Sequence, residues 1–246
     1  MDEITEDAVL DGRVRLRQPA RGYRAGADAA LLAAACDAGE GQRVIEAGCG
    51  AGAVLLAAAA RRPGARFVGV ERDPAAAALA RQNVALNGLE ARVEIVEGDV
   101  ALRFSGLHLE PFDAALANPP FFDDPQSLRG PAAERRGAWL AEDGLAAWTG
   151  FLSKAVREGG TITVIHRADR LGDILALLAD KAGSFQVRPV HPFADAPAKR
   201  VIVRAVKTGK APLQLLAPLV LHAREGGGHS DEAEAIFRGR ADLAWL

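Results

Sequence analysis

The chain has 246 residues, of which 49% are hydrophobic, so it is long enough for one large domain or two small ones, and it contains no apolar run near the roughly 18 residues of a membrane helix. With 30 basic and 32 acidic residues its net charge is -2, which gives no global electrostatic case for nucleic-acid binding, so any such partner needs a local basic patch. Two cysteines, Cys36 and Cys49, exclude a disulfide framework and favour a reduced, cytoplasmic setting, and the five scattered histidines lack metal-ligand spacing, so no metal is predicted.

The N-terminal region, residues 1–27, begins with an acidic stretch unlike a signal peptide and then becomes rich in arginine. The alternation of Val14, Leu16 and Gln18 predicts a short hairpin or edge strand. The arginines between and after these residues form either a solvated strand face or a contact with a phosphate backbone. Residues 28–36 then predict a helix with Asp28 as its N-cap.

From residue 43 onward, strands and helices alternate. This spacing predicts a doubly wound α/β fold with a mainly parallel seven-stranded sheet and helices on both faces. We expect one domain, 1–246, in which 1–40 is an extension with a hairpin and a helix and 41–246 is the core. The expected strands are 43–47, 67–71, 92–97, 112–117, 161–166, 185–190 and 200–206, with a further short strand within 213–221. The expected helices are 53–62, 73–87, 145–156 ended by Gly159-Gly160, 170–181 ended by Gly183, and one in the C-terminal tail.

The stretch 46–52, Glu-Ala-Gly-Cys-Gly-Ala-Gly, follows a strand and precedes a helix, the context in which a glycine-rich turn binds a ligand through backbone N–H groups. Two interpretations compete. Gly48, Gly50 and Ala53 fit the loose dinucleotide pattern G-x-G-x-x-A, with Glu71 to hold a ribose, which indicates an NAD(P)-dependent oxidoreductase. The pattern E-x-G-x-G-x-G instead indicates S-adenosylmethionine (SAM).

Three acids stand at the ends of three successive strands, where ligands of open α/β sheets bind. For SAM, Glu46 would interact with the ammonium group, Glu71 with the ribose hydroxyls and Asp99 with the adenine amino group. The predicted cofactor site comprises Glu46, Gly48, Cys49, Gly50, Gly52, Glu71, Arg72, Asp99, Val100 and Asn118.

The fourth strand leads to a stiff corner, Asn118-Pro119-Pro120-Phe121, because proline fixes its own φ and holds the preceding residue extended. The Asn118 side-chain oxygen and the Pro119 carbonyl can accept the two N–H bonds of an amino group and orient it for methyl transfer. Phe121 offers a flat face for a planar substrate. An oxidoreductase has no need of this corner, so the SAM interpretation is favoured, with Asn118, Pro119, Pro120 and Phe121 as catalytic residues. The polar stretch 123–139 beside it is either a lid or a plain loop.

The order of the glycine turn, the two later acids and the N-P-P-F corner resembles the amino-group methyltransferases with the N-P-P-[YF] motif. Residues 18–32 and 226–239 are similar to the bacterial tRNA adenine methyltransferases that modify the base beside the anticodon of a valine tRNA. The resemblance covers nearly the whole chain. It implies a Rossmann-like methyltransferase fold, SAM as cofactor and methylation of the exocyclic amino group of adenine in tRNA.

This resemblance leaves other acceptors open. Phe121 stands where the family often has Tyr, so stacking survives without a hydroxyl contact. Some ribosomal-RNA guanine methyltransferases carry N-P-P-F-H, although Phe122 replaces that histidine here. Release-factor glutamine methyltransferases carry an N-terminal helical domain for which residues 1–40 leave no room. A small-molecule amino group and a non-enzymatic SAM-sensing RNA-binding module are further alternatives.

An RNA partner requires a basic patch despite the balanced charge. Two sets of basic residues are expected to form it if both face the carboxyl edge of the sheet. They are Arg13, Arg15, Arg17, Arg21 and Arg24 in the first set, and Lys199, Arg200, Arg204, Lys207 and Lys210 in the second.

Overall fold

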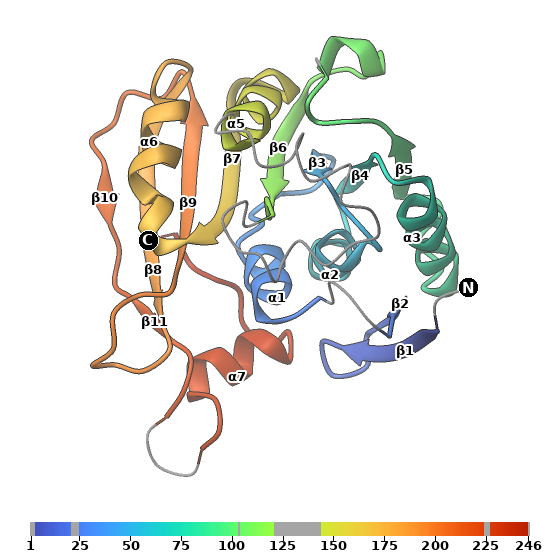
Figure 1. The fold of residues 1–246 in the computed structure, drawn as a ribbon, viewed down its shortest axis with the longest axis horizontal. Helices are drawn as coiled ribbons and strands as arrows, with labels where there is room; N and C mark the ends of the chain where they lie inside the picture. The colour runs from blue at the N-terminus through green and yellow to red at the C-terminus, as the bar shows by residue number, and fades with distance from the viewer. Residues whose placement is uncertain (1–2, 21–24, 103, 121–143, 224–226, 246) are drawn as a thin grey trace, which may run out of the picture.

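The computed structural model describes residues 3–20, 25–102, 104–120, 144–223 and 227–245, and Figure 1 shows their arrangement. In this part of the chain a nine-stranded sheet forms the centre of the fold. Its strands are β3 (Arg43–Ala47), β4 (Arg66–Glu71), β5 (Val93–Glu97), β6 (Phe112–Ala117), β7 (Val156–Arg167), β8 (Ala182–His191), β9 (Arg200–Lys207), β10 (Gln214–Leu215) and β11 (Leu219–Val220).

The strand order is β10-β8-β9-β7-β6-β3-β4-β5, with β11 also paired to β8. Paired strands are parallel except at β9, which runs antiparallel to both β7 and β8. The seven expected strands are all present, and the expected strand within 213–221 is divided into β10 and β11 around Pro218. The central strands are buried on both faces, which explains why their sequences are continuously apolar rather than alternating.

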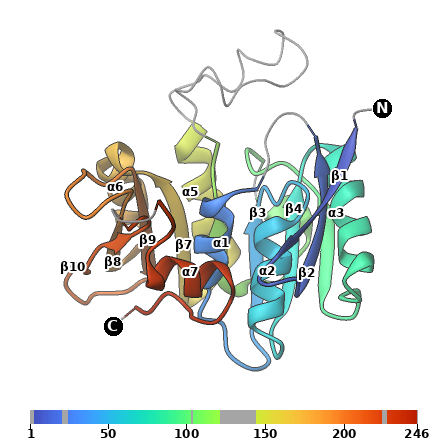
Figure 2. The same cartoon turned by 90° about the horizontal axis from the view of Figure 1, so that it is seen from below.

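Helices cover both faces of the sheet, as predicted. One face carries α1 (Ala27–Ala34), α2 (Ala53–Arg61), α3 (Pro74–Leu86) and α7 (Asp231–Phe237), and the other carries α5 (Gly144–Ala155), α6 (Leu171–Ala179) and the short 3-10 turn η1 (Phe104–Leu107). Figure 2 shows α1, α2 and α7 on one side of the sheet, with α5 and α6 beyond it. Among the described helices, none combines the length and the apolar character that a bilayer span requires.

Three expected helix boundaries, at Asp28, Gly159-Gly160 and Gly183, are wrong. Asp28 is not the N-cap of α1, a position held by Gly26; Asp28 lies in the first turn and its carboxylate pairs with Arg200 at 2.9 Å. Gly159-Gly160 does not end α5 but forms part of β7, where the register with β6 shifts. A Cβ on Gly160 would lie 2.9 Å from the carbonyl oxygens of Arg157 and Asp113, so glycine is required for this close approach.

Gly183 is a similar case. It was expected to end the helix before it, but α6 ends at Ala179 and Gly183 belongs to β8. The expected start and end of α3 are confirmed. The Asp73 side chain accepts a hydrogen bond from the N–H of Ala75, Pro74 occupies the first turn, and Gly88 follows the helix with φ of +63°.

The expected N-terminal hairpin is present as β1 (Ile4–Val9) and β2 (Val14–Pro19), which pair antiparallel. The alternation read from the sequence is confirmed, since Val14, Leu16 and Gln18 are 1%, 1% and 5% exposed. Two asparagines of α3 and its C-cap fix the strand by bonding its backbone: the Asn83 and Asn87 side chains accept from the N–H groups of Arg17 and Arg15.

Candidate active site

The predicted site residues of four strands meet at one edge of the sheet. Ala47 at the end of β3 is level with Val70 of β4 and with Ala117 of β6, and Val70 is level with Val96 of β5. Because these strands are parallel, the segments that follow them all leave at the same carboxyl edge. The glycine turn, Glu71, Asp99 and Asn118 are therefore neighbours, as the sequence predicted.

The glycine turn has a backbone that requires glycine. Gly48, Gly50 and Gly52 have φ of +64°, +54° and +87°, the left-handed region that other residues rarely adopt. A Cβ on Gly48 would also lie 2.2 Å from Cη2 of Trp148, so the indole of α5 packs directly against the turn. Trp148 was not among the residues predicted for the site. An aromatic residue on a buried helix face gives no signal of its own, and the contact depends on how α5 crosses the sheet.

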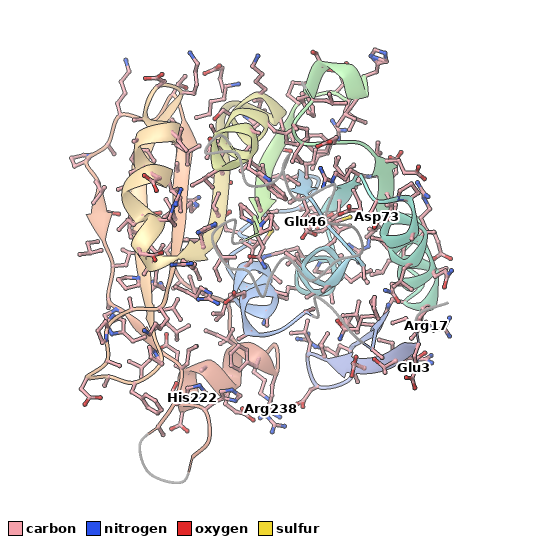
Figure 3. All side chains as sticks on the ribbon, viewed as in Figure 1. Glu3, Arg17, Glu46, Asp73, His222 and Arg238 are labelled. Atoms are coloured by element: carbon pink, nitrogen blue, oxygen red, sulfur yellow. The ribbon has the colours of Figure 1, made fainter. Side chains whose placement is uncertain are left out.

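Glu46 is a buried acid beneath this turn. Its side chain is 2% exposed, and in Figure 3 it lies inside the fold, unlike Glu3 at the surface. Burial raises the pKa of Glu46 well above its usual range; a hydrogen bond from the Leu55 backbone opposes the rise and the nearby Glu71 carboxylate adds to it. Its Oε2 atom has no hydrogen-bond partner among the described residues. A buried acceptor of this kind suits a cationic or hydrogen-bond-donating ligand.

Glu71 holds the glycine turn to the next helix. Its Oε2 accepts from the N–H of Gly50 and its Oε1 from the N–H of Asp73, each at 2.9 Å. Each oxygen keeps a further lone pair for a ligand. At the end of β5, Asp99 accepts from the N–H of Ala101 at 2.9 Å and lies 3.6 Å from the guanidinium of Arg72. At the ends of β4 and β5, acids that accept hydrogen bonds from backbone amides thus line the edge. Cys49 is buried and free, and burial raises the pKa of its thiol.

The N-P-P corner begins directly after β6. Asn118 and Pro120 are half-buried and Pro119 is buried. Phe121, Phe122 and the expected loop 123–139 lie outside the described residues, so their predicted roles stay predictions.

A second residue missed by sequence analysis, His166, lies beside the corner near the end of β7. It is 2% exposed, and burial lowers the pKa of its imidazole to about 4. The histidines were assessed for metal-ligand spacing, and that criterion overlooked this one. The available signal was its position at the end of the expected strand 161–166, which the structure places next to β6.

The expected basic residues divide between the two edges of the sheet. Arg15 bonds through its backbone to Asn87, the C-cap of α3, and α3 starts at the carboxyl edge, so Arg15 lies toward the opposite edge. Arg15 and Arg17 both pair with Glu6, and Arg13 donates to the carbonyl of Gly239.

In the second set, Lys199 and Arg200 lie at the carboxyl edge, where Arg200 is level with Arg167 of β7. Arg204 lies farther along β9 and pairs with Asp37. Lys207 donates to the carbonyl of Val156 at the start of β7, on the opposite edge. The described residues therefore do not gather both sets into one patch, and Arg21 and Arg24 lie outside them.

Comparisons with known proteins agree with this geometry. Residues 25–133 match the family model of the methyltransferase small domain. The crystal structure of a predicted O-methyltransferase from Agrobacterium tumefaciens is 28% identical, with a TM-score of 0.75, and the match covers 88% of this chain and 98% of that one. The expected Rossmann-like methyltransferase fold is thereby confirmed.

Two curated relatives are both tRNA1(Val) (adenine(37)-N6)-methyltransferases. The protein from Aeromonas salmonicida is 34% identical over 64% of this chain and 65% of its own length. The protein from Yersinia enterocolitica is 32% identical over 72% of this chain and 69% of its own length. The similarity thus spans about two thirds of these relatives. The second relative, 32% identical and covered over more than two thirds of its length, shows that the chain belongs to the tRNA1(Val) (adenine(37)-N6)-methyltransferase family.

Proposed function

We propose that this protein is a SAM-dependent methyltransferase that methylates the exocyclic N6 amino group of adenine in tRNA, with adenine 37 of tRNA1(Val) as the first substrate to test. The observation that carries the proposal is the placement of the Asn118-Pro119 acceptor pair on the same edge as the glycine turn and the buried acid Glu46. The names of the curated relatives supply the substrate.

The residues at this edge fit SAM. The unsatisfied Oε2 of buried Glu46 suits the ammonium group, and the left-handed turn at Gly48, Gly50 and Gly52 lets the backbone approach a ligand closely. Glu71 and Asp99 offer acceptors for the ribose hydroxyls and the adenine amino group, beside Arg72 and Val100. When bound, SAM supplies an electrophilic methyl group whose leaving thioether is neutral.

The corner residues act on the acceptor. The lone pair of an exocyclic amino group is delocalised into the base, so the nitrogen is a poor nucleophile. In our proposal the Asn118 side-chain oxygen and the Pro119 carbonyl accept its two N–H bonds, orient the nitrogen and stabilise the positive charge that develops on it. Pro120 stiffens the corner, and Phe121 stacks on the base, a contact worth about 1–3 kcal/mol.

For RNA binding, the basic residues at the carboxyl edge are the better candidates. Lys199 is exposed at that edge, next to Arg200, whereas Arg15 lies toward the opposite edge. We propose that Lys199 and Arg200 contact the tRNA backbone, with Arg204, Arg21 and Arg24 as further candidates, and that the protein works in the cytoplasm, where its substrate is found.

The test is methyl transfer from labelled SAM to four acceptors in parallel: unmodified tRNA1(Val) transcript, the same transcript with adenine 37 replaced by guanine, total ribosomal RNA and a protein extract. We expect N6-methyladenosine in the first transcript and no label in the second. Label confined to ribosomal RNA or protein would refute the tRNA assignment, and label on a ribose hydroxyl would refute the amino-group chemistry.

A further inference from the structure

Four aromatic rings form a row at the end of the sheet that lies away from the glycine turn. They belong to Phe193, His222, His229 and Phe237, and the centroids of successive rings are 5.6, 5.2 and 4.7 Å apart. The two imidazoles are stacked, with 22° between their planes. Figure 3 shows His222 beside α7, well apart from Glu46. The proposed methyl transfer uses none of these four rings.

The row stands at the carboxyl edge of the sheet, which also carries the N-P-P corner. The end of β8, the start of β9 and the end of β7 are level. β11 runs parallel to β8, and its last residue, Val220, is level with His191. Because β8 and β11 run in the same direction as β6 and β7, the segments that carry Phe193 and His222 leave the sheet on the same side as the corner.

Backbone hydrogen bonds fix the row. The N–H of His222 donates to the carbonyl of Pro192 at 3.0 Å, which joins the segment after β11 to the segment after β8. The N–H of Ala196 donates to the carbonyl of Phe193 at 3.0 Å and closes a turn. His222 and His229 face each other across an antiparallel bridge. Rings that are held in this way lose little conformational freedom when a ligand stacks on them.

The outer end of the row is open to solvent. Phe193 is 41% exposed, whereas Phe237 at the other end packs against the hydrophobic core. The Glu234 carboxylate beside the row is paired with Arg238 and lies 3.3 Å from Nδ1 of His229, so its charge is already engaged. Phenyl and imidazole faces are the surfaces on which proteins stack the unpaired bases of single-stranded RNA loops.

We propose that Phe193, supported by His222 and His229, is a stacking site for an unpaired tRNA base other than the one that is methylated. Exposed Lys199, at the end of the same segment, would contact a phosphate of that RNA strand. The inference rests on the proposed function and deepens it, because it names a second contact by which the substrate is recognised.

The distance between the two sites suits one continuous RNA segment. Three strand spacings of about 4.8 Å separate β6 from β8, which places Phe193 about 14 Å from the corner along the edge. About four stacked nucleotides cover this distance at about 3.4 Å each. A base on Phe193 and the acceptor adenine at the corner can therefore belong to the same loop.

The test compares two variants of Phe193. Phe193→Leu keeps an apolar side chain but removes the flat ring, so the Kd for tRNA1(Val) transcript should rise about 5- to 20-fold, the lower part of the range for base–aromatic stacking. Phe193→Trp keeps a flat face and should bind at least as tightly as the wild type. The KM for tRNA should rise with the Kd in Phe193→Leu. Its kcat at saturating tRNA, its SAM affinity and its melting temperature should stay near those of the wild type.

Salt dependence and a matched control separate stacking from other effects. Stacking releases no counterions, so Phe193→Leu should weaken binding equally at each salt concentration, whereas loss of a phosphate contact makes the salt dependence shallower. Leu215→Ala is the control: Leu215 of β10 is 69% exposed beside β8, but it is level with Val187, away from the carboxyl edge. This variant should leave tRNA affinity unchanged.

Three outcomes overturn the inference: wild-type tRNA affinity of Phe193→Leu, an equal loss of affinity in Phe193→Trp, or an equal loss in Leu215→Ala. A lowered melting temperature of Phe193→Leu with unchanged tRNA affinity would assign the ring to packing and also contradict the inference. Wild-type protein that methylates no tRNA would instead refute the proposed function, so the two failures are distinguishable.

Discussion

The carboxyl edge of the sheet has two halves that are held together differently. The cofactor half, at the ends of β3, β4 and β5, is tied by backbone amides that donate to acids: Gly50 and Asp73 to Glu71, and Ala101 to Asp99. The acceptor half, at the ends of β6 and β7, has two prolines, which lack N–H groups and therefore cannot form such amide bonds. The cofactor half is therefore held by backbone amides that donate to acids, and the acceptor half by the fixed φ angles of Pro119 and Pro120.

The largest expected effect separates the two halves by function. Asn118→Ala removes one of the two proposed acceptors of the amino group, so turnover should fall by about 10³-fold, as when an enzyme loses one preorganised hydrogen bond to its transition state. SAM affinity, measured by calorimetry, should stay near that of the wild type. Single-turnover methylation of tRNA1(Val) transcript measures the rate.

The matched control for this variant is Asn87→Ala. The Asn87 side chain bonds the backbone of Arg15 at the opposite edge, where it holds the hairpin to α3. It should cost some stability and leave turnover intact. Unchanged turnover in Asn118→Ala would remove the amino-orienting role from the acceptor half.

The next effect falls on the cofactor half. Glu46→Gln replaces the proposed partner of the ammonium group with a neutral amide, so SAM affinity should fall about 10- to 100-fold, as charge-assisted hydrogen bonds contribute about 1.5–3 kcal/mol. Turnover at saturating SAM should change much less. Glu97→Gln, an exposed acid at the end of β5 paired with Arg81, is the control. Equal SAM affinity in both variants would contradict the role of Glu46.

The raised pKa of Glu46 also predicts that the stability of the folded protein falls as the pH rises. The folded-state pKa of Glu46 lies above its ordinary value of 4.5, so the folded protein retains a proton that the unfolded chain releases. The contribution of this group to stability is thus fully present below pH 4.5 and is lost as the pH rises toward the folded-state pKa. Glu46→Gln lacks this loss, so it should melt higher than the wild type at pH 7 and similarly at pH 4 in the absence of ligand.

The difference between the halves also explains what the sequence could predict. The strands, the glycine turn and the acids at the strand ends follow from local patterns, and the parallel sheet then brings them to one edge. Trp148 carries no local pattern, because its importance comes from its contact with Gly48 across the fold. His166 lies beside the corner only because β7 pairs with β6. The basic residues were grouped because they are close in sequence. In the structure the direction of each strand places Arg200 at the carboxyl edge, and Lys207 and Arg15 at the opposite edge.

Trp148 allows a test of how the glycine turn is supported. Gly48→Ala places a methyl group against the indole and an L-residue at φ of +64°, a conformation that costs about 1–2 kcal/mol. SAM affinity should fall about tenfold by this mechanism. Trp148→Leu in the same chain should relieve the collision, so the double variant should bind SAM better than Gly48→Ala alone. Additive losses in the double-mutant cycle would show that the two residues act separately.

The smallest expected effect concerns which half of the edge meets the RNA backbone. Lys199→Glu reverses an exposed charge beside Arg200, so tRNA affinity should fall severalfold and the salt dependence of binding should become shallower, since each phosphate contact contributes about 0.9 to the logarithmic slope on a duplex. Arg15→Glu makes the same charge change at the opposite edge, on a side chain already paired with Glu6, and should leave both quantities nearly unchanged. Filter binding at three salt concentrations measures them. An equal loss in the two variants would mean that the RNA extends over the hairpin, and the acceptor half would then be larger than the ends of β6 and β7.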